Sequence, residues 1–105
     1  MIEILQNKEN FDKIEFNASD GEEKLGRIAG ELKGEEFVID ELECEEFFTD
    51  GLVRAILNMM ELHGIDKARF ELPEADLERL RRLGFFKDES RIESIAGFFS
   101  GGCNS

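Results

Sequence analysis

The sequence predicts an α+β fold, a mixed α/β layer in which helices pack on a mostly antiparallel sheet. Apolar and polar residues alternate in several segments before residue 45, which is the period of half-buried strands. After Phe48 the apolar spacing changes to that of an amphipathic helix, and a short alternating segment and a second helical pattern follow. A length of 105 residues suits one domain. We expect it over residues 1–99, with a flexible tail at 100–105.

The expected strands form an antiparallel meander separated by turn signals. These strands are Met1–Leu5, Phe11–Ala18, Lys24–Leu32 and Glu36–Cys44, with turns at Ser19–Gly21 and Lys33–Gly34. Gly26 and Gly30 indicate a bulge or a close backbone approach. Strict alternation in the last strand divides its apolar residues between two faces, with Phe37 and Ile39 on one and Val38, Leu42 and Cys44 on the other.

The change of period after Phe48 predicts a central helix. Its apolar residues follow the spacing i, i+1, i+4, i+5 and i+8, and they are Leu52, Val53, Ile56, Leu57 and Met60. Thr49 or Asp50 is placed to cap the first turn, and Gly64 fits the left-handed position after the last turn. The sequence therefore predicts a central helix that ends before Gly64.

The region after the central helix predicts a crossover. Lys67–Leu72 alternates as a strand, and a helix crossover allows it to run parallel to the strand before the helix. Pro73 begins a second helix that ends at Gly84 and has an apolar stripe of Leu77, Leu80 and Leu83. After it, Phe85 and Phe86 return to the core. Ser90–Phe99 is open between a strand and a helix, and a capping box of Ser90 and Glu93 favours the helix.

Charge and hydrophobic content exclude several classes of function. Asp+Glu 25 against Lys+Arg 13 gives a net charge of −12, which argues against nucleic acid or an anionic membrane as a partner. Ten Phe and 41% hydrophobic residues argue against a disordered acidic chain. The longest apolar stretch, Leu52–Met60, is too short to cross a membrane, and no leader pattern is visible. Two cysteines without metal-ligand spacing predict a reduced cytoplasmic protein with no metal site.

Several residues have both a functional and a structural interpretation. In the functional interpretation, His63, the sole histidine, is a base or a ligand. In the structural interpretation, which we favour, it contacts the carbonyls at the end of the central helix. Met59 and Met60 line an adaptable groove or belong to the core. The acidic run over residues 35–46 is a docking surface or a solvated sheet face. Cys103 in the Gly-rich tail is a reactive or an ordinary thiol.

Two consecutive segments resemble part of a known fold. They are Asp50-Gly-Leu-Val-Arg-Ala-Ile-Leu-Asn-Met-Met-Glu-Leu-His-Gly-Ile65 and Ala68-Arg-Phe-Glu-Leu-Pro-Glu-Ala-Asp-Leu-Glu-Arg-Leu-Arg-Arg-Leu-Gly-Phe85. With the hairpin before them, they resemble the C-terminal part of the GNAT (acyl-CoA N-acyltransferase) fold. In that family a hairpin leads to a long central helix, a short strand, another helix and a closing Leu-Gly-Phe. The similar region runs from about Lys24 to Phe86.

The resemblance implies acetyl-CoA as the cofactor and a glutamate as the general base. Family members bind acetyl-CoA through backbone N–H groups at the start of the central helix, which here are those of Gly51, Leu52, Val53 and Arg54. The base is often on the strand before that helix, where this chain has Glu41 and Glu43.

The sequence departs from the family pattern where the chemistry occurs. The family fingerprint reads Arg or Gln, two residues, Gly, one residue, and then Gly or Ala. Gly51 matches it, but Phe48 and Val53 stand at its two ends, and Asp50 adds a carboxylate near the pyrophosphate. Many members use a Tyr on the last helix as an acid. This chain has no Tyr, and Leu80 stands at about that position.

We therefore expect an acetyltransferase-like domain without efficient acetyl transfer that acts as a binding or regulatory module. One alternative is a small acetyl-CoA-dependent N-acetyltransferase. The other is an acidic protein-interaction module, which includes a homodimer formed through a sheet edge.

Overall fold

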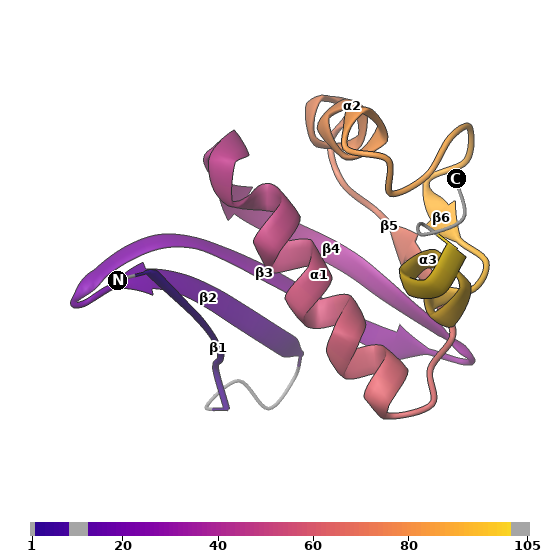
Figure 1. Cartoon of the computed structure of the whole chain (residues 1–105), viewed down its shortest axis with the longest axis horizontal. Helices are drawn as coiled ribbons and strands as arrows, with labels where there is room; N and C mark the ends of the chain where they lie inside the picture. The colour runs from indigo at the N-terminus through magenta and orange to yellow at the C-terminus, as the bar shows by residue number, and fades with distance from the viewer. Residues whose placement is uncertain (1, 9–12, 102–105) are drawn as a thin grey trace.

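The computed structural model describes residues 2–8 and 13–101, and Figure 1 shows their arrangement. In this part of the chain, strands and helices follow one another as β1 (Ile2–Gln6), β2 (Ile14–Asp20), β3 (Glu23–Lys33), β4 (Glu36–Cys44), α1 (Glu46–Leu62), β5 (Lys67–Phe70), α2 (Glu74–Arg82), β6 (Arg91–Ile92) and α3 (Ile95–Gly101). The α+β class predicted from the sequence is confirmed.

The strands form one sheet whose spatial order is the order of the chain, β1-β2-β3-β4-β5-β6. Neighbouring strands are antiparallel, except that β4 and β5 are parallel over Glu36–Ile39 and Lys67–Phe70. α1 connects these two strands and crosses one face of the sheet (Figure 1). Both the predicted meander and the predicted parallel strand after the crossover are confirmed.

A β-bulge in β4 decides which of its residues face α1. The register shifts where Gly30 pairs with Ile39, and Asp40 is the extra residue on β4. As a result, apolar residues on both sides of the bulge pack into the core with α1, and they are Phe37, Ile39, Leu42 and Cys44. The prediction from strict alternation was wrong here, because one extra residue reverses the alternation beyond it.

Gly30 confirms the predicted close backbone approach. A Cβ atom at this position would lie 2.3 Å from the backbone oxygen of Val38 and 2.9 Å from the ring of Phe37. No side chain fits there unless β3 and β4 move apart. A second register shift, between Ala18 and Ser19, occurs where β2 pairs with the segment around Gly26.

α1 begins earlier than the sequence predicts. Glu45 is its N-cap residue and the helix starts at Glu46, so the prediction of Thr49 or Asp50 as the cap was wrong. Thr49 is fully buried, and its hydroxyl accepts a hydrogen bond from the Arg79 guanidinium. The hydroxyl therefore connects α1 with α2, and α1 extends three residues N-terminal to Thr49, to Glu46.

The ends of α1 and α2 match the sequence prediction. His63 follows the last residue of α1, and Gly64 has a φ of +78°. Gly84 follows α2 with a φ of +90°. Glycine adopts these left-handed conformations without the strain that a Cβ atom brings.

The segment that the sequence leaves open contains both a strand and a helix. β6 pairs with β5, and α3 follows it. The predicted cap at Ser90 was wrong, because the hydroxyl oxygen of Ser94 accepts the hydrogen bond from the backbone N–H of Gly97, at 3.0 Å. α3 continues to Gly101, and Cys103 lies outside the described residues.

The three helices share one core with the sheet. α2 contributes Leu80 and α3 contributes Ile95 to the cluster around α1. Phe85 and Phe86 return to this core as predicted, with exposed fractions of 3% and 7%. Within the described ranges, no helix lies on the opposite side of the sheet, which we call the helix-free face. No helix in these ranges combines the length and the apolar character needed to cross a membrane.

Candidate functional site

The start of α1 is the place where the resemblance puts acetyl-CoA. Because the helix begins at Glu46, Gly51 and Arg54 lie beyond its first turn. Their backbone N–H groups, and those of Leu52 and Val53, donate to carbonyl groups one turn earlier inside the helix. Leu52 and Val53 also have fully buried side chains in the core. The structure thus places the four predicted cofactor residues in the body of α1.

Gly51 and Arg54 have contacts of their own that hold α1 in place. A Cβ atom on Gly51 would lie 2.9 Å from the Cδ1 atom of Ile4, so glycine lets α1 pack closely on β1. The Nε of Arg54 donates to both carboxylate oxygens of Asp50 at 3.0 Å. Its guanidinium also lies over two rings, 5.7 Å from the centroid of Phe85 and 5.4 Å from that of Phe98.

Arg79 of α2 occupies the space between the end of β4 and the first turn of α1. Its Nη1 donates to the hydroxyl of Thr49 at 3.0 Å and to the backbone oxygen of Cys44 at 3.3 Å. β4 and β5 pair only as far as Ile39 and Phe70, after which the chain turns toward α2 (Figure 1). The guanidinium therefore joins the end of β4, α1 and α2, five residues beyond the last pair of the two parallel strands.

The two candidate bases, Glu41 and Glu43, lie on the helix-free face. Lys13 donates to Glu41 Oε2 at 2.6 Å and to Asp40 Oδ2 at 2.8 Å. Arg27 donates to the other oxygen of Glu41 and contacts the exposed Glu43 at 3.3 Å. The hydrogen bond from Lys13, followed by that from Arg27, lowers the pKa of Glu41. A general base works best with a pKa near the operating pH, so this environment favours a carboxylate that is ionised at neutral pH.

The same network includes a buried carboxylate. The side chain of Glu15 is only 7% exposed, and it accepts hydrogen bonds from Arg27 Nη2 at 3.2 Å and from Asn7 Nδ2 at 3.3 Å. Contact with Glu15, followed by contact with Glu41, raises the pKa of Arg27. We call the connected charged residues the ion-pair network; they are Lys13, Glu15, Arg27, Asp40, Glu41 and Glu43.

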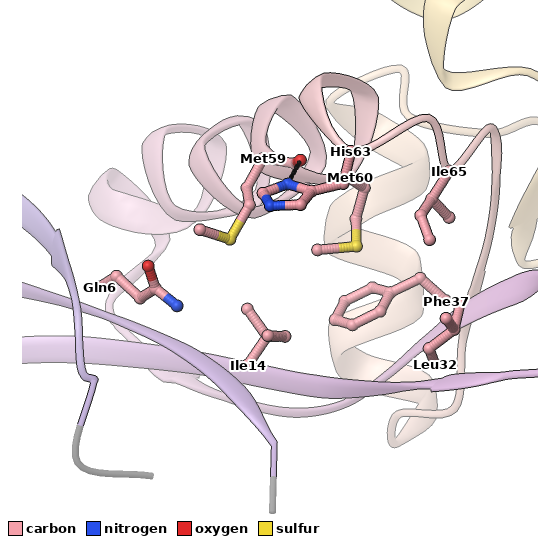
Figure 2. A pocket seen from close by; sticks show the side chains of 8 residues that line it. All are labelled: Gln6, Ile14, Leu32, Phe37, Met59, Met60, His63 and Ile65. Carbon is pink, nitrogen blue, oxygen red and sulfur yellow. Dashed lines mark hydrogen bonds between the residues drawn. The ribbon is translucent and has the colours of Figure 1, made fainter. Parts of the chain in front are cut away.

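An apolar pocket lies between the C-terminal half of α1 and the strands beneath it (Figure 2). Its volume is about 240 Å³. Leu32 at its rim is 51% exposed, so the pocket is open to solvent beside the end of β3. The side chains that line it are Gln6, Ile14, Leu32, Phe37, Met59, Met60, His63 and Ile65. All of these except Gln6 and His63 are apolar.

His63 places an imidazole ring at the edge of the pocket. Its Nδ1 lies 2.9 Å from the backbone oxygen of Met59, which confirms the predicted contact with the carbonyls at the end of the helix. Because a carbonyl oxygen only accepts hydrogen bonds, Nδ1 carries the hydrogen, and in the neutral ring Nε2 is left as an acceptor. Figure 2 shows this second nitrogen on the pocket side of the ring.

The sequence indicated only part of this pocket. Met59 and Met60 were expected to line a groove or to belong to the core, and they do both. Four lining residues that come from strands were missed, and they are Gln6, Ile14, Leu32 and Phe37. A large apolar residue next to a charged hairpin turn was the available signal at Leu32, but only the sheet register brings the other strands beside it.

A second hollow, of about 460 Å³, is polar. It is lined by as many arginine as acidic side chains, which are Arg69, Arg81, Arg91, Glu74, Asp88 and Glu89, together with Leu77 and Ser90. Arg69 contacts Glu71 at 2.7 Å, and Arg81 contacts Glu74 at 3.9 Å. The basic residues of this region are thus compensated by carboxylates.

In the part of the chain that the structure describes, no group of three His, Cys, Asp or Glu side chains is placed to hold a metal ion. The chain matches no protein-family model, and a search of curated proteins finds no match either.

Proposed function

We propose that this chain is a GNAT-like domain without efficient acetyl transfer that acts as a binding module, with the apolar pocket as its binding site. The observation that carries the proposal is the position of the start of α1. Since the helix begins at Glu46, the backbone N–H groups of Gly51 to Arg54 are hydrogen-bonded inside the helix. The donors that would hold a pyrophosphate are therefore already in use.

The order of the elements supports the GNAT-like scaffold. The hairpin β3–β4, α1, β5 and α2 follow one another as the resemblance requires. α2 is followed by Leu83-Gly84-Phe85, in which Gly84 has a left-handed φ and Phe85 is buried. This support concerns the arrangement of the chain and carries no activity with it.

Two further features argue against acetyl transfer. Glu41 is held by two cations whose hydrogen bonds lower its pKa, which makes it a poor proton acceptor near neutral pH. The chain also carries a net charge of −12. This charge repels a multiply charged anion such as acetyl-CoA.

A calorimetric titration of the whole chain with acetyl-CoA tests the absence of transfer. We expect no heat at millimolar ligand and no release of free coenzyme A thiol in the presence of amines. Binding in the micromolar range, or thiol release that depends on Glu41, would overturn this half of the proposal and favour the small N-acetyltransferase instead.

A titration with a small neutral apolar probe, 4-propylanisole, tests the pocket. We expect binding that is lost in Leu32→Trp, because the indole fills the pocket from its exposed rim. Leu62→Trp is the matched control, since Leu62 is 77% exposed and does not line the pocket. Equal binding by both variants would contradict the assignment of the site.

A second candidate function is the acidic interaction module. β1 is a terminal strand of the sheet, and its Ile2 and Leu5 are 47% and 60% exposed. Terminal strands present backbone groups that can pair with another chain. Light scattering distinguishes this candidate, because a mass of 12.0 kDa at all concentrations would exclude the homodimer.

A further inference from the structure

In the described part of the chain, two polar side chains line the apolar pocket, and their placement restricts the kind of ligand that fits. We propose that the pocket takes a compact neutral molecule of one ring or an equivalent branched chain that carries a single hydroxyl group. This inference rests on the proposed function, because it names the ligand class of the same pocket. Three properties of the pocket support it: the volume, the lining, and the hydrogen-bonding capacity of Gln6 and His63.

The volume sets the size of the ligand. An apolar cavity of about 150 Å³ binds benzene in a well-studied protein, and drug-sized ligands occupy roughly 300–1,000 Å³. The pocket, at about 240 Å³, falls between these values. It therefore accommodates a ring with a short substituent, and it is too small for a long acyl chain or a nucleotide.

The lining sets the orientation of the ligand. Figure 2 shows the amide of Gln6 at one end of the pocket, with Phe37, Leu32 and Ile65 at the other. The imidazole of His63 lies above the space between them. A ligand with an apolar body thus places that body against Phe37 and its polar group toward Gln6 and His63.

The hydrogen-bonding groups select a hydroxyl. Since Nδ1 of His63 donates to Met59, the neutral ring offers Nε2 as an acceptor for the ligand O–H. The side-chain amide of Gln6 has N–H groups that can donate to the same oxygen. A hydroxyl group donates once and accepts as well, whereas an ether only accepts.

Charge argues against a carboxylate in the same place. Among the residues that the structure describes, no Lys or Arg side chain lines the pocket, and the net charge of the chain is −12. An ionised carboxylate that leaves water for an apolar pocket needs a cation partner to offset its lost hydration. A neutral phenol or alcohol has no such requirement.

Three matched probes test the inference on the whole chain: 4-propylphenol, 4-propylanisole and 4-propylbenzoate. Affinities come from calorimetry, and the site is located by amide chemical-shift changes around Met59 and Phe37. We expect the phenol to bind roughly three- to tenfold more tightly than the anisole, which is the effect of one net hydrogen bond. The benzoate is expected to bind more weakly than either.

The variant His63→Phe tests the acceptor. It keeps a ring at this exposed position but removes Nε2, so we expect the ratio of phenol to anisole affinity to fall to about one. Leu62→Phe is the control, because Leu62 precedes His63 and does not line the pocket. Circular dichroism of each variant checks that α1 is intact.

The outcomes separate the inference from the proposed function. Equal affinities for the phenol and the anisole, tightest binding by the benzoate, or an unchanged phenol preference in His63→Phe would each overturn the hydroxyl assignment and leave the pocket as a binding site. If none of the probes binds, the proposed function fails together with the inference.

Discussion

The substitution Arg27→Met is the most direct test of the ion-pair network. It removes the guanidinium that donates to Glu15 and Glu41 and leaves an unbranched apolar side chain in place of the arginine stem. Glu15 is the partner that matters, because its side chain is 7% exposed. A buried carboxylate that loses a cationic partner keeps its desolvation penalty and loses the attraction that offset it.

The magnitude follows from this burial. Breaking a fully buried ion pair costs roughly 3–5 kcal/mol, and leaving a buried polar group under-bonded costs about 1–3 kcal/mol. Arg27 is 24% exposed, and Glu15 keeps its hydrogen bond from Asn7. We therefore expect a loss of about 3 kcal/mol in the free energy of unfolding. For a chain of this size, that lowers the melting temperature by roughly 15 °C.

Urea unfolding, followed by circular dichroism, measures this loss. The matched control is Arg82→Met, which breaks a 3.1 Å contact with Glu46 whose side chains are 64% and 61% exposed. We expect a loss of about 0.5 kcal/mol or less in the control. Equal losses in Arg27→Met and Arg82→Met would refute the reasoning, since burial would then have no effect.

A double variant sharpens the test. Replacing the second partner as well, in Arg27→Met with Glu15→Leu, removes the buried charge along with its cation. Apolar replacement of both members of a buried pair is often neutral. We expect the double variant to recover most of the stability lost in Arg27→Met. A double variant less stable than the single one would show that Glu15 is held chiefly by groups other than Arg27.

Three further outcomes are expected. Gly30→Ala should lower the free energy of unfolding by about 2 kcal/mol, measured by urea, because its Cβ atom would collide with the backbone of Val38. Lys13 and Arg27 lower the pKa of Glu41, so its contribution to stability is present above the ordinary glutamate value and is lost as pH falls through the folded value. Between pH 5 and 3, wild type should thus lose more stability than Glu41→Gln, and parallel curves would contradict this. Asp66→Ala should increase hydrogen exchange in α3, because its carboxylate accepts a hydrogen bond from the backbone N–H of Ala96; unchanged exchange would exclude that role.

The sequence predicts the features of this fold that depend on local rules. The apolar spacing from Leu52 to Met60 identifies α1, because the period of a helix is a property of neighbouring residues. Gly64 and Gly84 mark helix ends for a similar reason, since each adopts a left-handed conformation that other residues avoid. These predictions needed no knowledge of the rest of the chain.

Features that depend on pairing between distant segments were not predictable in this way. The bulge at Asp40 exists because β3 and β4 shift register beside Gly30. Gly30 indicated a bulge or a close approach on β3, but the sequence of β4 gives no sign that Asp40 is the extra residue opposite it. The predicted start of α1 was wrong because threonine is a common N-cap residue. In the structure, the hydroxyl of Thr49 instead accepts a hydrogen bond from Arg79, thirty residues later in the sequence.

The candidate site divides along the same line. Met59, Met60 and His63 could be singled out as candidates, with a structural interpretation beside the functional one, because they lie close together in sequence at the end of α1. Gln6 and Leu32 were not, because they come from different strands that only the sheet brings near that helix. In a pocket between a helix and a sheet, sequence patterns can thus indicate the lining residues of the helix. Those from the strands depend on the topology of the sheet.

The two ends of α1 differ in whether their side chains are already engaged in contacts within the fold. At the N-terminal end, the hydroxyl of Thr49 accepts a hydrogen bond from Arg79, and Gly51 packs closely against Ile4 of β1. Arg54 is hydrogen-bonded to Asp50 and lies over two aromatic rings. At the C-terminal end, Met59 and His63 border an open apolar volume. Atoms already engaged in packing must be released before they can hold a ligand, and that release costs stability. A ligand at the C-terminal end would require no such release, which supports the proposed pocket over the site that the resemblance implies.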